Sequence, residues 1–131
     1  MKKLLLIASL LFFSAGIVQA DNGMTKEQAA SAIAASRPAL AKKIEKMEAR
    51  FNSTNTAKMQ ESADAVYDAI IEGMRLTHTL LNVEAPENRA AVNARYLQLE
   101  KSANQFHIYK ADAAAHKDIL LKAAQDFEQK Y

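Results

Sequence analysis

Beyond residue 20, apolar residues recur along most of the chain at intervals of three and four, which is the spacing of one face of a helix. This part of the chain is rich in Ala, Lys, Glu, Gln and Leu and contains only two glycines and two prolines. That composition favours helix nearly everywhere, and no segment alternates as a strand would. The pattern therefore predicts an all-α protein.

The first predicted helix begins after Thr25 and runs to about Phe51. Thr25 and Gln28 have the spacing of a capping box, in which each side chain binds a free backbone N–H of the other residue. Pro38 lies inside this helix and lacks a backbone donor, so it is expected to kink or split the helix near Ser36.

Two further helices follow, separated by short polar segments. Residues 52–55 end the first helix and offer caps for a second one over about residues 56–81. Residues 82–86 form the next loop, with Pro86 placed for a first helical turn. The apolar positions of the second helix are Met59, Ala63, Val66, Ile70, Met74 and Leu81, and those of the third are Val92, Tyr96, Leu99, Ala103 and Phe106.

The apolar spacing of the third helix would next fall on Lys110, which is charged. The pattern therefore predicts a break in the helix there. Asp112 is a suitable cap for a fourth helix, whose apolar positions are Ile119, Leu120, Ala123, Phe127 and Tyr131. Four helices with short loops predict an up-down-up-down antiparallel four-helix bundle. The alternative is a three-helix coiled coil with one long C-terminal helix, but a rod of about 45 residues at 1.5 Å each would project far beyond its partners.

The first twenty residues have a different pattern, with Lys2 and Lys3 followed by an apolar run over residues 4–13 and a small-residue exit ending at Ala20. This layout is typical of a cleaved secretory signal peptide over residues 1–20, and the apolar run is short for a membrane span. Residues 21–131 then form a single helical bundle domain, and we expect the protein to be periplasmic or secreted.

Signal removal changes the charge of the chain. Two of the 17 basic residues are lost with it and none of the 15 acidic residues, so 17 − 2 = 15 basic residues balance 15 acidic ones. A neutral chain gives no reason to expect nucleic acid as a partner.

There is no cysteine, so neither a disulfide nor lipid attachment after the signal is available. No nucleophile turn, phosphate-binding loop or metalloprotease run is present, and we expect a protein that is not an enzyme.

Cations gather on one side of the first helix. Lys42, Lys43, Lys46 and Arg50 fall within an arc of about 100° on the side away from the apolar positions. Such a face suits another protein or an anionic envelope component, although a solvated face beside Glu45 and Glu48 is the common outcome. The leading hypothesis is a small exported helical binding or accessory protein of the cell envelope that acts through a helix face.

Soft metal ligands suggest the alternative. Met74 and His78 are four residues apart, but a helical wheel places Met74 in the core and His78 on its rim. In an antiparallel bundle, Met47, Met59 and His116 gather at one pole, with His116 in the middle of the fourth helix's apolar stripe. Thioether and imidazole suit haem iron or copper, and ordinary core packing of the same residues is the competing interpretation.

The last five residues, Phe127 to Tyr131, are similar to the end of the soluble periplasmic b-type cytochromes. The resemblance implies a four-helix bundle that holds haem between a methionine on the first helix and a histidine near the end of the fourth. Met24 falls where that methionine would lie, but the position of the haem histidine is Glu128 in this chain. The resemblance therefore supports the architecture, and a haem or copper carrier stays the alternative function.

Overall fold

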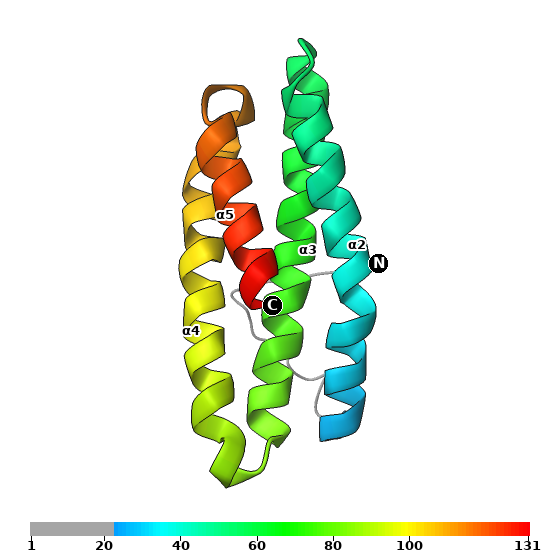
Figure 1. Cartoon of the computed structure of the whole chain (residues 1–131), viewed down its shortest axis with the longest axis vertical. Helices are drawn as coiled ribbons and strands as arrows, with labels where there is room; N and C mark the ends of the chain where they lie inside the picture. The colour runs from blue at the N-terminus through cyan, green and yellow to red at the C-terminus, as the bar shows by residue number, and fades with distance from the viewer. Residues whose placement is uncertain (1–22) are drawn as a thin grey trace.

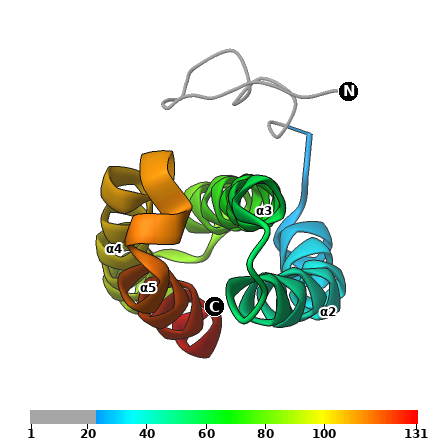
Figure 2. The ribbon, with the colours of Figure 1, turned by 90° about the horizontal axis from the view of Figure 1, so that it is seen from above.

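The computed structural model describes residues 23–131, so the predicted signal over residues 1–20 lies outside the described residues. Within the described range the chain forms four α-helices and one short 3-10 helix, and no strand occurs there. The elements are α2 (Lys26–Phe51), α3 (Thr56–Val83), α4 (Pro86–Tyr109), η1 (Lys110–Ala115) and α5 (Lys117–Lys130). Neighbouring helices are antiparallel, and seen from above α5 lies beside both α4 and α2 (Figures 1 and 2). The predicted four-helix bundle is confirmed.

The helix starts follow the predicted signals. Thr25 Oγ1 accepts the Gln28 N–H at 3.1 Å, and Gln28 Oε1 accepts the Thr25 N–H at 2.9 Å, which completes the capping box. Asn55 caps α3 by accepting the Lys58 N–H at 3.0 Å. Pro86 lies in the first turn of α4, where a missing N–H costs no helical hydrogen bond.

Pro38 does not split the first helix, so the predicted split near Ser36 is absent. The helix α2 is continuous over 26 residues, with Pro38 inside it. The turn before the proline is held additionally by Ser36, whose hydroxyl donates to the Ile33 carbonyl at 2.8 Å. A proline removes only one backbone donor, and burial of this helix on both sides of Pro38, at Ile33 and Leu40, favours a continuous element.

The predicted break after Phe106 is present, which excludes one continuous C-terminal helix. The break is the helix η1, inside which Asp112 has φ −134° and ψ 79°, outside the helical region. Asp112 therefore does not cap the last helix. That helix starts at Lys117 and has His116 at its N-cap position, without a capping side-chain hydrogen bond.

One continuous core runs through the bundle. The largest fully buried side chains are Leu40, Met47, Val66, Ile70, Thr77, Leu99, Phe106, Leu120 and Phe127. Most of the predicted seam residues are buried, whereas Met74, Leu81, Tyr96 and Ile119 are only half-buried. Across residues 23–131, no helix combines the length and the apolar character needed to cross a membrane.

Gly73 allows the end of α5 to pack closely on α3. A Cβ at this position would lie 3.1 Å from Phe127 Cζ and 3.1 Å from Tyr131 Cε1. This close approach lets the short helix α5, of 14 residues, pack its last turn against the middle of α3 (Figure 1).

Candidate functional site

The four predicted cations lie on one side of α2, near its C-terminal end. Lys42, Lys43 and Lys46 are exposed, and Arg50 is half-exposed. The opposite side of the same segment is buried through Leu40, Ile44, Met47 and Phe51. The helical spacing therefore places the apolar residues in the core and turns the four cations outward, as predicted. We call Lys42, Lys43, Lys46 and Arg50 the cationic face.

Like charges adjoin one another on this face. Lys46 follows Lys43 by three residues and Lys42 by four, and Arg50 follows Lys46 by four. On a helix these spacings bring side chains together, and each like-charged pair costs about 0.2–0.5 kcal/mol. None of the four makes an ion pair with another described residue. The fold therefore leaves all four cations without an ion pair, with exposed Glu45 and Glu48 in the same segment of α2.

Three other cations of the described chain make contacts within the fold. Lys122 lies 2.9 Å from the Asp126 carboxylate and Lys26 lies 3.5 Å from that of Glu84. Lys110 lies over the Tyr67 ring, 4.8 Å from its centroid. The hydrogen bond donated by the Ala85 N–H lowers the pKa of the Glu84 carboxyl below its usual range. The nearby charge of Lys26 lowers this pKa further, and burial partly opposes both effects. These contacts separate structural cations from those of the cationic face.

The pole proposed as a soft-metal site is assembled only in part. The ends of α2 and α5 do meet, since Lys117 Nζ donates to the Phe51 carbonyl at 3.4 Å. Met47 and Met59 both belong to the buried core. His116 is half-buried at the η1–α5 junction instead of in the middle of an apolar stripe, and its ring packs edge-on against Tyr109 with the centroids 5.0 Å apart. The predicted position of His116 within the apolar stripe of the last helix is wrong, because α5 starts one residue after His116.

Gln60 organises this pole, and sequence analysis did not identify it. Its Nε2 donates to the Lys110 carbonyl at 2.6 Å, and its Oε1 accepts the Ala113 N–H at 3.0 Å. One side chain thus satisfies both a backbone acceptor and a backbone donor of η1, which lie 50 and 53 positions away in sequence. No local pattern marks such a contact. The amide holds the irregular turn against α3 and sets where α5 begins.

Met74 and His78 have different surroundings. Met74 is half-buried and packs against the core, whereas the His78 ring lies 5.7 Å from the Tyr96 ring between centroids. Asn82 Nδ2 lies 3.5 Å from His78 Nδ1. The predicted rim position of His78 is therefore right, and its neighbours are an aromatic ring and an amide.

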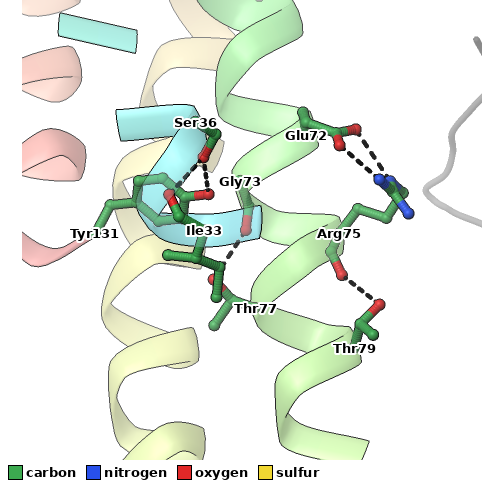
Figure 3. Close-up of polar contacts among 8 residues, drawn as sticks. All are labelled: Ile33, Ser36, Glu72, Gly73, Arg75, Thr77, Thr79 and Tyr131. Atoms are coloured by element: carbon green, nitrogen blue, oxygen red, sulfur yellow. Dashed lines mark hydrogen bonds and ion pairs between the residues drawn. The ribbon is translucent and has the colours of Figure 1, made fainter. Parts of the chain in front are cut away.

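A second polar cluster ties the end of α5 to α2. Ser36 donates its only hydroxyl proton to Ile33, so the Tyr131 hydroxyl donates to Ser36 Oγ at 2.5 Å (Figure 3). Arg37 Nη2 and Nε donate to the main-chain oxygen of Tyr131 at 2.7 and 3.1 Å. Burial raises the pKa of the Tyr131 phenol, partly opposed by its bond to Ser36. These contacts serve packing, and we call Ser36, Arg37, Gly73, Phe127 and Tyr131 the α5 clamp.

The residues suggested by the cytochrome resemblance do not face one another as a buried pair. Met24 is half-buried against the core, and Glu128 is exposed on α5. Among residues 23–131, no three His, Cys, Asp or Glu side chains are grouped as they would be to hold a metal ion. Comparison with protein-family models, with curated proteins and with solved structures finds no match to this chain.

Proposed function

We propose that this chain is a small exported binding or accessory protein of the cell envelope, which docks the cationic face of α2 onto a negatively charged protein or envelope component. The observation that carries the proposal is four adjoining cations on a rigid helix, none of them ion-paired within the described chain. The signal-like pattern of residues 1–20 supports the envelope as the place of action.

The chemistry of such a contact is electrostatic. An anionic partner relieves the repulsion among Lys42, Lys43, Lys46 and Arg50, in addition to its direct attraction to each of them. Near a negatively charged surface, each lysine or arginine contributes about 1 kcal/mol. Four of them together give an interaction that depends steeply on salt, because exposed charges are screened within about 8–10 Å at physiological ionic strength.

The test is sedimentation of the mature protein with isolated cell envelopes, at low and at physiological salt. The variant Lys42→Gln/Lys43→Gln/Lys46→Gln/Arg50→Gln should lose binding at least about a hundredfold. A matched control removes the same charge from positions outside the cationic face, as Lys26→Gln/Lys58→Gln/Arg89→Gln/Arg95→Gln. Equal loss of binding in both variants would show that only net charge matters, and it would overturn the proposal.

The alternative function is a haem or copper carrier at the pole of Met47, Met59 and His116. The same purified sample tests it through its Soret absorption and its copper content after loading. Stoichiometric uptake that His116→Ala abolishes would favour the carrier over the binding protein.

A further inference from the structure

A groove runs along the outside of the bundle between α4 and α5. It encloses about 560 Å³, and its lining combines lysines and amides with apolar Ile119 and Ala123. The full lining is Gln98, Lys101, Ser102, Gln105, Ile119, Lys122, Ala123, Asp126 and Lys130. Three lysines against one aspartate give the groove a net positive charge. It lies on other helices than the cationic face of α2, and it is a separate site.

The two walls of the groove have the shape that receives a helix. The α4 wall repeats at residues 98, 101, 102 and 105, and the α5 wall at 119, 122, 123, 126 and 130. These are helical spacings, so each wall is a straight ridge, and the α5 wall spans twelve residues or about 16 Å. A third helix laid between two such ridges packs ridge into groove.

The charge of the groove is only partly neutralised. Lys122 is paired with Asp126, with 2.9 Å between the charged atoms, and 77% of the Lys122 side chain is nevertheless exposed. Lys101 and Lys130 are exposed and form no ion pair with any other described residue. The occupant that complements this groove is therefore a helix with acidic residues along one face.

The chain itself presents such a helix face. Glu61, Asp64, Asp68 and Glu72 are all exposed and follow one another on α3 at intervals of three, four and four. This row lies on the side of α3 opposite the buried Val66, and it covers twelve residues, the same length as the α5 wall. Glu61 and Glu72 pair with cations of the same helix, at 3.9 Å from Lys58 and 2.5 Å from Arg75. Asp68 makes no ion pair within the described range, and Asp64 has only an amide contact with Gln60, at 3.2 Å. We call these four residues the acidic row.

We propose that the α4–α5 groove of one copy receives the acidic row of α3 from a second copy. The two surfaces differ, so the contact is heterologous and joins copies head to tail, as a ring or a short chain. Exposed ion pairs are individually weak and are screened by salt, so the association is concentration-dependent and strongest at low ionic strength. Ile119 and Ala123 add apolar contact beneath the charged pairs.

Charge exchange tests this contact with four proteins and no unknown ligand. Sedimentation velocity at low salt should show the average mass of the mature wild-type protein rising with concentration. The groove variant Lys101→Glu/Lys130→Glu and the row variant Asp64→Lys/Asp68→Lys should each raise the dissociation constant at least about tenfold. An equimolar mixture of the two should associate again, because the unchanged groove of the row variant meets the unchanged row of the groove variant, and the two exchanged surfaces are complementary as well. One chain carrying all four substitutions should also associate with itself.

The matched control is Lys43→Glu/Lys46→Glu, which changes the charge as much as the groove variant does but on the cationic face. It should associate like the wild type. Wild-type protein that stays monomeric at every concentration would overturn the second-copy proposal, and the groove would then be left for an acidic helix of another protein. Variants that associate normally, or a mixture that stays monomeric, would overturn it as well. Circular dichroism of each variant checks that the helices are retained.

Discussion

Arg37 and Lys46 are two cations on the same helix, nine residues apart, and their side chains have different surroundings. Arg37 donates two hydrogen bonds to the Tyr131 main-chain oxygen and lies over the Tyr131 ring, 5.8 Å from its centroid. Lys46 is exposed, adjoins other cations, and makes no ion pair within the described range. The N-terminal half of α2 therefore uses its polar residues to close the bundle, whereas the C-terminal half leaves its charges available.

The comparison separates stability from binding along one helix. Substitutions in the α5 clamp should change the free energy of unfolding, and substitutions in the cationic face should change only interactions with partners.

The largest effect is expected in the α5 clamp itself. Phe127 is fully buried, and its ring packs against the Tyr131 ring with centroids 5.5 Å apart. Phe127→Ala should lower the free energy of unfolding by about 3–5 kcal/mol, through lost burial and the cavity left behind. Urea denaturation measures the change, with exposed Glu128→Ala as the neighbouring control. A loss below 1 kcal/mol would mean that α5 is not clamped as described.

A smaller effect is expected from the clamp's hydrogen bonds. Tyr131→Phe keeps the ring and removes one bond to Ser36, at a cost of about 0.5–1.5 kcal/mol. Burial raises the pKa of Tyr131 in the folded state, so the unfolded chain loses its phenolic proton first as the pH rises. Stability is then full below the unfolded value near 10 and falls above it. Chemical denaturation between pH 8 and pH 11 should show a shallower decline for Tyr131→Phe than for the wild type.

His116 tests the corrected start of the last helix. A core histidine in an apolar stripe would make His116→Asp strongly destabilising, but the residue stands half-buried at the N-cap of α5, where aspartate is a preferred side chain. We expect the variant to be as stable as the wild type or up to about 1 kcal/mol more stable. A urea midpoint clearly below that of the wild type would instead support a position of His116 within the apolar stripe.

The smallest effect is expected in the cationic face. Lys43→Gln/Lys46→Gln should leave the free energy of unfolding within about 0.5 kcal/mol of the wild type, and any change should be a gain from reduced repulsion. Thermal melts at low and high salt measure it. A loss of more than 1 kcal/mol would show that these lysines serve the fold, against the separation drawn above.

Most of the fold follows from local signals in the sequence. The capping box at Thr25, the Asn55 cap and the position of Pro86 depend on residues within one helical turn, and all three are as predicted. The outward position of the four cations depends only on helical spacing, and it too is predicted correctly.

The errors arise where distant segments decide the backbone. Asp112 has the right chemistry for a cap, but Gln60 holds η1 in another conformation through two hydrogen bonds. Pro38 has the chemistry of a helix breaker, but the buried residues on either side keep α2 continuous. His116 was misplaced because a shift of a few residues in the helix start moves a side chain from an apolar stripe to a cap. The α5 clamp joins residues almost a hundred positions apart, which no local pattern reveals.

The most direct test of the cationic face as a binding surface is a site-specific photo-cross-link in intact cells. Ala49 is exposed on α2 beside the cationic face, and a photoreactive residue there leaves all four cations in place, while exposed Ala30 near the start of the same helix serves as the control. We expect an adduct with a protein or envelope component from Ala49, diminished by high salt and absent from Ala30. Adducts from Ala30 alone, or equally from both positions, would contradict the cationic face as a binding surface.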